Sequence, residues 1–415
     1  MRRQPFPAPS TLDAPAATDA VDASPRAPPQ RAAWVEIDVD AIRHNLRLIR
    51  KLAGRARVYA VAKGDAYGFD AATIARLVAA EGIDALACGD PDDVRAIRVA
   101  GVTLPILLYG STGAAQLPAL AALDVIVTAH DATTLDTCIA HHLAFSVKLD
   151  AGFNRLGFRD EDLQHVLATA QTHPSARVHG VYTHLTDMDD LASMAAQVQR
   201  FNAMAARIEA AGWRGLERMV ASSRVMIAAP GLAFDAVNPG RLVYGIFEEP
   251  WDRMVDARSA LSSVKARIIA LKRVAAGAVP GYSGIAVTRD TLLAVIPFGF
   301  GDGYPRLPAG GTVLVRGQRA SLVGPRHTEH SIVDVTDVAG VALGDEVVLL
   351  GTQGSEAIAI HDLVAATGVP LIELVPRLAR NPRRVLLDKS PVQSHPKQAR
   401  VPRSVPHPEG VTHER

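Results

Sequence analysis

Short apolar runs alternate with helical stretches through the first part of this chain, and that alternation constrains its fold more than any other feature. Turn residues bound the runs, and stretches with helical spacing, such as 92–100, 160–172 and 194–211, separate them. Eight strands alternating with helices over about 200 residues predict an α/β fold built on one (β/α)8 barrel. The expected strands are 57–62, 85–88, 105–109, 124–128, 144–149, 178–182, 218–220 and 234–237.

Two further regions flank the barrel pattern. Residues 34–38 alternate as a strand, and Asp40 is placed to cap a helix over 41–52. Beyond Arg267, short β-like runs separated by Gly-containing turns predict a second, mostly β domain. Its expected strands are 265–271, 291–296, 312–315, 321–323, 331–335 and 346–350. We therefore divide the chain into a disordered tail (1–32), the barrel (33–266), the β domain (267–388) and a second disordered tail (389–415).

The overall composition excludes several classes of partner. The chain has 415 residues and a formal net charge of +1, so no global electrostatic attraction to nucleic acid or to a membrane is expected. No transmembrane run is present, and the first residues lack the apolar core of a secretion signal, which favours a cytoplasmic location. Cys88 and Cys138 each lie in an apolar context, which predicts buried thiols rather than a disulfide.

One strand leads directly to a lysine. The apolar run 58–62 ends at Lys63, and a Gly-Asp-Ala-Tyr67-Gly68 turn follows before a helix that begins near Ala71. In parallel α/β folds the chemistry gathers at the carboxyl ends of the strands. A lysine desolvated there has a lowered pKa, and its neutral amine attacks carbonyl groups. From this stretch alone, an ordinary lysine at a strand end remains an equal alternative.

Polar side chains also follow several other expected strands. Because parallel strands present their carboxyl ends at one face of a barrel, we expect these side chains to meet there and form a site. They are Lys148 and Arg155, His184, Ser222 and Ser223, and Asn238 with Gly240.

The order of motifs resembles the alanine racemase family of pyridoxal-phosphate enzymes. Ala60-Val-Ala-Lys63-Gly-Asp-Ala-Tyr-Gly68 is similar to the family's cofactor-lysine signature, and Lys148-Leu-Asp-Ala-Gly-Phe-Asn-Arg155-Leu-Gly-Phe is similar to its internal motif. Further similar segments follow in order from about Trp34 to Leu387. They are Thr183-His184, Asn238-Pro-Gly-Arg-Leu-Val-Tyr244-Gly, Gly281-Tyr282-Ser-Gly, Gly301-Asp-Gly-Tyr304-Pro-Arg306 and Val333-Asp-Val-Thr-Asp.

The resemblance implies a racemisation with two bases. Lys63 would hold pyridoxal 5'-phosphate as an internal aldimine, and its amine would then serve one face of the amino-acid Cα. Tyr282, from the other subunit of a head-to-tail homodimer, would serve the opposite face, because a single base returns the proton to the face it left. His184 would lie beside the cofactor ring; its alternative is a core histidine with satisfied hydrogen bonds.

The resemblance also implies the binding groups for cofactor and substrate. Arg155 would contact the phenolic oxygen of the cofactor and the substrate carboxylate. Lys148 matches a lysine that is carbamylated in some members. The phosphate would be held by the Tyr67 and Ser223 hydroxyls and by backbone N–H groups around Gly240 and Arg241.

Several positions depart from the family pattern. The family has an arginine at the pyridine nitrogen, for which Arg224 is a candidate, with Asn238 as a neutral residue near the same face. Ser222-Ser223 replaces a typical Asn-Ser, and His327-Thr328-Glu329 replaces Cys-Met-Asp in the substrate-facing loop. Phe300 replaces a tyrosine at the substrate entrance. Thr328 is therefore a predicted substrate contact, and alanine or another small or polar amino acid is the predicted substrate.

Other classes of protein remain open at this point. A fold-related decarboxylase would want an acidic partner for the ring nitrogen and a cysteine in the β domain, and no cysteine follows Cys138. An aldolase would want a metal, yet His327 and His330 have no convincing third ligand, so we predict no metal site. A non-catalytic cofactor-binding protein is usually a barrel alone, which the β domain with Tyr282 argues against.

Overall fold

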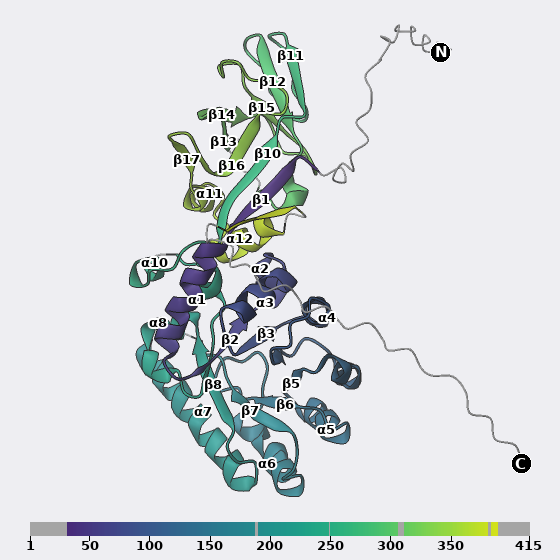
Figure 1. Ribbon diagram of the computed structural model, residues 1–415, viewed down its shortest axis with the longest axis vertical. Coiled ribbons are helices and arrows are strands. Elements are labelled where there is room, and N and C mark those ends of the chain that lie inside the picture. The colour runs from purple at the N-terminus through teal and green to yellow at the C-terminus, as the bar shows by residue number, and fades with distance from the viewer. Residues whose placement is uncertain (1–30, 187–189, 249, 306–310, 381–382, 389–415) are drawn as a thin grey trace, which may run out of the picture. The chain divides into compact units, whose positions relative to one another are not determined.

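A computed structural model describes residues 31–186, 190–248, 250–305, 311–380 and 383–388. The two predicted tails lie outside these described residues, apart from Arg31 and Ala32. Figure 1 labels the helices and strands. Within the described chain no helix is long and apolar enough to cross a bilayer.

Eight parallel strands close into a barrel, as the alternation predicted. Each strand pairs with the next, and the last pairs with the first through Arg57 and Ala236. All eight expected strands form, with ends shifted by a few residues. They are β2 (Arg57–Val61), β3 (Ala85–Cys88), β4 (Ile106–Leu108), β5 (Ile126–Ala129), β6 (Phe145–Lys148), β7 (Val178–Tyr182), β8 (Glu217–Ser222) and β9 (Ala236–Asn238).

Helices cover the outside of the barrel (Figure 1). Their apolar faces and the outward faces of the strands form one core, while a smaller cluster that includes Tyr59, Leu107 and Met219 fills the barrel interior. The helices of this region are α1 (Val39–Ala53), α2 (Lys63–Tyr67), α3 (Ala71–Ala80), α4 (Pro91–Val99), α5 (Ala132–Ala140), α6 (Leu163–Thr172), α7 (Leu191–Ala211), α8 (Ser223–Ala228), α9 (Arg241–Tyr244) and α10 (Trp251–Met254). The short 3-10 helices η1 (Ala114–Leu123), η2 (Asp160–Asp162) and η3 (Pro230–Leu232) complete it.

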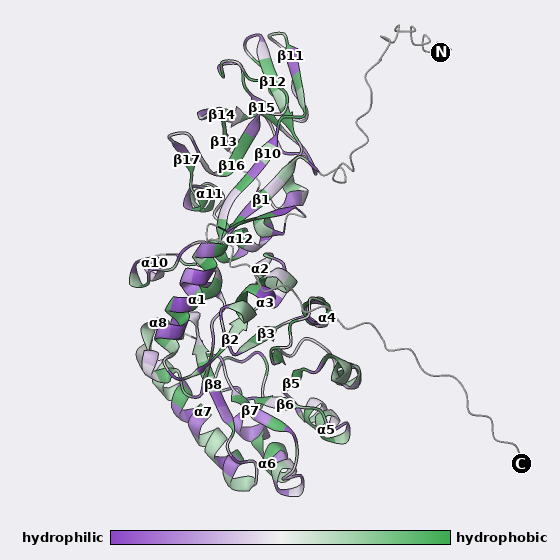
Figure 2. Ribbon diagram, viewed as in Figure 1, coloured by the Kyte–Doolittle hydropathy of each residue, from purple (hydrophilic) through white to green (hydrophobic). Residues whose placement is uncertain are grey.

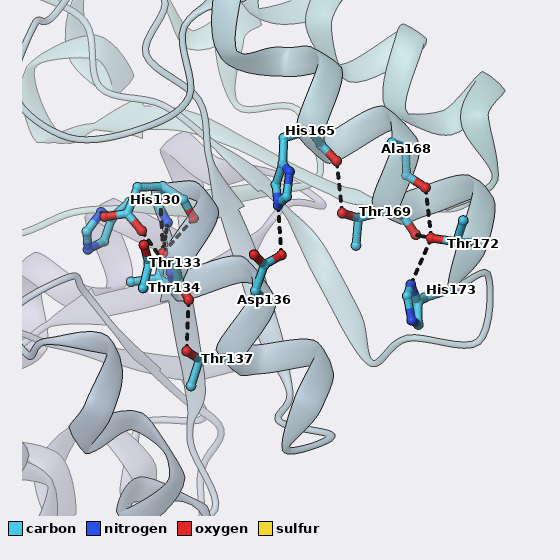
Figure 3. Close-up of polar contacts among 11 residues, drawn as sticks. His130, Thr133, Thr134, Asp136, Thr137, His165, Ala168, Thr169, Thr172 and His173 are labelled. Carbon is cyan, nitrogen blue, oxygen red and sulfur yellow. Dashed lines mark hydrogen bonds and ion pairs between the residues drawn. The ribbon is translucent and has the colours of Figure 1, made fainter.

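Neighbouring helices are joined by polar contacts at the surface as well as by apolar packing. Figure 3 shows α5 and α6 linked by the His165 Nε2 and Asp136 Oδ1 atoms, which lie 2.7 Å apart. Both side chains are exposed, so this pair contributes little to stability.

The packing of the helices depends on their apolar residues. Figure 2 shows hydrophilic and hydrophobic residues on different faces of α1. Ile42, Leu46 and Ile49 are buried on one face of α1, as their spacing predicted.

The second domain is a ten-stranded sheet. Its strand order is β11 (Ala270–Val274), β12 (Thr291–Ile296), β15 (Ser331–Asp334), β14 (Gln318–Leu322), β13 (Gly311–Val315), β16 (Glu346–Gln353), β10 (Leu261–Arg267), β1 (Ala33–Asp38) and β18 (Arg384–Leu387). Strand β17 (Glu356–Ile358) pairs with β16, and the helices α11 (Ile360–Thr367) and α12 (Leu371–Ala379) follow it in sequence, while the 3-10 helix η4 (Phe300–Asp302) follows β12.

The domain boundaries differ from those expected. Strand β1 pairs with β10 and β18, so the chain enters the second sheet first and then builds the barrel. The range 33–266 expected for the barrel thus includes β1 and most of β10, which pair within the second sheet. A period-two pattern shows that a segment is a strand but does not show which sheet it joins.

Local details differ too. The first helix is capped by Asp38, whose side chain accepts from the Ala41 N–H at 2.8 Å, so the expected cap Asp40 lies inside the first turn. The predicted strand 265–271 is broken between Arg267 and Ala270 into two strands with different partners. Cys88 and Cys138 are buried free thiols, as predicted.

Candidate active site

A cavity of about 770 Å³ opens at the carboxyl ends of the barrel strands. It brings together every barrel residue that the sequence analysis named for the site, and their roles there stay predictions. They are Lys63, Tyr67, Lys148, Arg155, His184, Ser222, Ser223, Arg224, Asn238, Gly240 and Arg241. Most of them were expected there because they follow parallel strands. Tyr67, Arg224 and Arg241 were expected from the family resemblance.

Positive charge dominates the walls of the cavity. Six cationic side chains line it, namely Lys63, Lys148, Arg155, Arg224, Arg241 and Arg380, and no Asp or Glu is among the lining residues that the structure describes. Like charges held close together disfavour one another's protonated forms and favour a bound anion. The cavity is therefore built for a ligand that carries more than one negative charge.

Lys63 begins α2, one residue after the end of β2, and its side chain lines the cavity. Its aliphatic stem packs against Gly89, and its Nζ lies 5.4 Å from the centre of the Tyr109 ring. Burial, followed by the nearby Arg155 guanidinium, lowers the pKa of Lys63. A lowered pKa raises the fraction of neutral amine, which is the form that reacts with a carbonyl carbon.

The turn after Lys63 is a single left-handed turn, drawn as α2. Gly64, Asp65, Ala66 and Tyr67 have φ angles of 62°, 58°, 53° and 56°. Only glycine adopts this conformation without cost, and each other residue loses roughly 1–2 kcal/mol. The sequence predicted a turn here but not that it would be left-handed. The left-handed turn places both Lys63 and Tyr67 on the cavity wall.

Tyr67 is held at one end of the cavity by aromatic packing. Its ring lies 4.9 Å from that of Tyr244, which stacks on Phe69 at 5.1 Å and donates through its hydroxyl to the Val61 carbonyl. Gly240 allows this arrangement, because a Cβ there would lie 2.5 Å from the Tyr67 hydroxyl oxygen. Burial raises the pKa of Tyr67, so it is a neutral hydroxyl.

Ser223 and the 240–242 turn lie beside Tyr67. The Ser223 Oγ accepts from the N–H groups of Gly240 at 2.9 Å and Leu242 at 3.1 Å. The Gly240 N–H thus has a partner within the chain, which was not expected of a phosphate ligand. Burial and the neighbouring Arg224 lower the pKa of Arg241. Two guanidinium groups near these hydroxyls suit a dianion.

Arg155, Lys148 and His184 form a second group of cavity residues, close enough to affect one another's charge. Burial, followed by the charge of Arg155, lowers the pKa of Lys148 to about 7, and its Nζ lies 4.6 Å from the centre of the Tyr182 ring. Burial, followed by the lysine charges, lowers the pKa of His184 to about 3, and its ring packs edge-on against Phe153 at 4.8 Å. His184 is therefore an uncharged hydrogen-bonding group at neutral pH.

Asn238 and Arg224, the two candidates for the cofactor ring nitrogen, have different surroundings. Asn238 is buried at the end of β9; its Nδ2 donates to the Tyr109 hydroxyl at 3.2 Å, and its buried Oδ1 has no hydrogen-bond partner in the described chain. The Arg224 guanidinium lies over the Trp251 ring at 5.4 Å and close to Arg241.

Tyr282 and Thr328 are not brought to this cavity. Tyr282 is 81% exposed, and its ring packs edge-on against His327 at 5.1 Å in the second domain. Thr328 is also exposed, and its carbonyl accepts from the Gly301 N–H at 2.8 Å. The Phe300 N–H donates to the His327 carbonyl oxygen at 3.0 Å. Two positions that depart from the family pattern therefore lie side by side.

Some lining residues were missed from sequence. Tyr109 directly follows β4 and Tyr182 ends β7, so the strand-end argument applied to every strand would have found both. Arg380 follows α12 in the second domain, and no motif or period in the sequence points to it.

Among the described residues no group of three or more His, Cys, Asp and Glu could hold a metal ion.

Models of one protein family match both domains of the chain. Residues 37–248 match the family model described as "Alanine racemase, N-terminal domain". Residues 261–386 match "Alanine racemase, C-terminal domain". The chain belongs to the alanine racemase family. It is therefore a racemase, an enzyme of the isomerase class. The two family matches confirm the predicted family, and the closed barrel followed by a β domain confirms the predicted fold class.

Relatives named alanine racemase match this chain over nearly their whole length. A protein named alanine racemase from Thioalkalivibrio sulfidiphilus is 37% identical over 359 residues, which are 83% of this chain and 96% of the relative. Another, from Sorangium cellulosum, is 32% identical over 84% of this chain and 97% of the relative.

Solved structures of the family match the fold as well. The alanine racemase from Bacillus anthracis with bound L-Ala-P superimposes with a TM-score of 0.79 at 26% identity, over 88% of this chain and 97% of that one. The alanine racemase of Streptomyces lavendulae superimposes with a TM-score of 0.75 at 28% identity, over 87% of this chain and 98% of that one.

Proposed function

We propose that this enzyme interconverts L- and D-alanine with pyridoxal 5'-phosphate bound in the barrel cavity. The observation that carries the proposal is Lys63, a lysine of lowered pKa in a cation-lined cavity of an alanine racemase family member. Cofactor phosphate and substrate carboxylate together supply the negative charge that the cavity walls favour.

The residues present fit this cofactor. The end of the cavity with Tyr67, Ser223, Gly240 and Arg241 offers hydroxyl and guanidinium donors to a phosphate. Lys63 would hold the cofactor covalently, and Arg155 would hold the substrate carboxylate. When bound, pyridoxal phosphate supplies an electron sink for a carbanion next to the amino nitrogen.

Two groups of the protein would move the Cα proton. The free amine of Lys63 takes or returns it on one face. Tyr282 of the partner subunit serves the other face of a site shared across a head-to-tail homodimer. The exposure of Tyr282, and its absence from the cavity of its own chain, support a role in another subunit.

Asn238 is our proposal for the residue that faces the cofactor ring nitrogen. Arg224 lies over Trp251 and next to Arg241, which favours a role at the phosphate end. The Asn238 Oδ1 is buried and has no hydrogen-bond partner among the described residues, which leaves an uncharged amide available instead. His184, neutral at physiological pH, would lie beside the same ring without adding charge.

Isotope exchange at Cα tests the proposed reaction. The protein is incubated in D2O with each of a panel of L- and D-amino acids, followed by chiral analysis. We expect deuterium incorporation with inversion for alanine, and for other small or polar amino acids if Phe300 and Thr328 widen the preference. Lys63→Ala should lose both the exchange and the visible absorbance of the bound cofactor, while the wild type keeps both. Racemisation retained in Lys63→Ala would overturn the assignment, and gas or aldehyde release would favour a decarboxylase or an aldolase.

A further inference from the structure

The left-handed turn that carries Lys63 and Tyr67 is held by an arginine from the other domain. Arg384 begins β18 at the edge of the second sheet and reaches the turn across more than 300 residues of sequence. Its Nε donates to the Gly68 carbonyl at 2.9 Å, and its Nη2 donates to the Asp65 Oδ2 at 2.8 Å. One planar guanidinium thus contacts both the middle and the end of the turn.

Asp65 ties the same turn to the barrel helices. Its second carboxylate oxygen accepts from the Ala71 N–H at 2.8 Å, where α3 begins. Its own N–H donates to the Asp93 carboxylate in α4 at 3.1 Å. The Asp65 side chain is about one-third exposed. Its two carboxylate oxygens therefore connect the turn to the start of α3 and to Arg384 of β18.

Packing from the second domain is tight at the end of the turn. A Cβ on Gly68 would lie 2.6 Å from the Pro376 carbonyl oxygen of α12. Three consecutive residues other than glycine have positive φ angles here, so the free chain would leave this conformation. The contacts from Arg384 and Asp65 oppose that tendency.

We propose that Arg384 and Asp65 are positioning residues, which hold the strained turn so that Lys63 and Tyr67 project into the cavity. This inference rests on the proposed function of Lys63 as the cofactor lysine. It makes the second domain part of each subunit's own site, in addition to the residues proposed to reach the partner's site. Arg384 contacts neither Lys63 nor Tyr67 directly among the contacts described, so its effect is transmitted by the turn.

Hydrogen exchange in the full-length protein tests the clamp. In Arg384→Met we expect the amides of residues 64–70 to exchange about tenfold faster than in the wild type, because the turn opens locally. Affinity for pyridoxal phosphate, measured by titration of the visible absorbance, should fall about tenfold, with a lower kcat. The matched control is Arg319→Met, which loses contacts to Glu356 and the Ala357 carbonyl elsewhere in the second domain. It should change neither measurement.

Two further variants keep the test decisive. Asp65→Asn is the milder change, since its amide oxygen still accepts from Ala71, and it should show the same effects to a smaller degree. Ala66→Gly tolerates the left-handed turn and should recover part of the cofactor affinity lost in Arg384→Met. Unchanged exchange at 64–70, or faster exchange with unchanged cofactor affinity, would overturn the positioning role. If the wild type binds no cofactor, the proposed function fails, and the exchange data still decide whether Arg384 holds the turn.

Discussion

Single residues in the cavity owe their chemistry to burial among like charges. Lys148 shows this most clearly, because its side chain is buried and lies near the positive charges of Arg155 and Lys63. Among the described groups that shift its pKa, Asp150 acts in the opposite direction. The result is a lysine that is partly neutral at pH 7, whereas an ordinary lysine is fully charged there.

Lys148 should make stability depend on pH. Its folded pKa is about 7 against 10.5 for the free side chain, so between these values the unfolded chain binds a proton that the folded chain releases. The free energy of unfolding should therefore rise as the pH rises through this window. From pH 7 to about pH 9.5, the wild type should gain on the order of 3 kcal/mol relative to Lys148→Met. Chemical unfolding in CO2-free buffers measures this, with the exposed Lys51→Met as control. Parallel curves for the wild type and Lys148→Met would contradict it.

The same neutral amine is the form that reacts with carbon dioxide. Carbamylation of Lys148 is our hypothesis, and the carbamate would place a negative charge near Arg155. Added bicarbonate should then stabilise the wild type and leave Lys148→Met unchanged. Unmodified Lys148 in gentle digests of the bicarbonate-treated protein would remove the hypothesis.

At the scale of elements, the barrel helices are fixed by a few buried polar contacts in addition to apolar packing. Asn45 in α1 is fully buried and joins α1 to the chain after the barrel. Its Nδ2 donates to the carbonyls of Val243 and Arg258, and its Oδ1 accepts from the Arg258 N–H at 2.8 Å. This one side chain therefore positions α1 against α9, the helix that follows Gly240.

Asn45→Ala should destabilise the fold by about 2–3 kcal/mol, because it leaves buried backbone groups without partners. Thermal or urea unfolding measures the loss. Asn202→Ala is the matched control, since the Asn202 Oδ1 has no hydrogen-bond partner among the described residues and its removal should cost less than about 1 kcal/mol. Equal losses in the two variants would mean that the Asn45 contacts contribute nothing specific.

At the scale of the whole molecule, the proposed site needs two subunits. Lys63 lies in the barrel cavity, whereas Tyr282 is exposed on the second domain. In a head-to-tail dimer each site would combine Lys63 of one subunit with Tyr282 of the other, an exchange that a two-fold axis makes reciprocal.

Complementation tests the shared site. Lys63→Ala and Tyr282→Phe should each be strongly impaired alone, but a mixed dimer contains one site with both residues intact. Random pairing makes about half of the dimers mixed, so co-expression should recover about one quarter of wild-type activity. The Lys63→Ala, Tyr282→Phe double variant co-expressed with Lys63→Ala is the control, because it can form no intact site. No recovery from the two single variants would place both residues in one chain or remove Tyr282 from the mechanism.

Local patterns in the sequence determined most of the barrel and much of its site. Alternating apolar runs and helices specify eight strands, and side chains at the carboxyl ends of parallel strands must meet at one face. Lys63, Arg155, His184 and Asn238 therefore come to the cavity by a rule that needs no coordinates.

Only the tertiary structure decided which sheet each strand joins and which distant residues reach the site. Strand β1 lies in the second sheet because its partners β10 and β18 come from the far end of the chain, and no local period encodes them. The same reason hides Arg380 and Arg384 from sequence reasoning. The hand of the turn after Lys63 also depends on distant contacts, since its left-handed conformation costs energy that long-range hydrogen bonds from Arg384 offset.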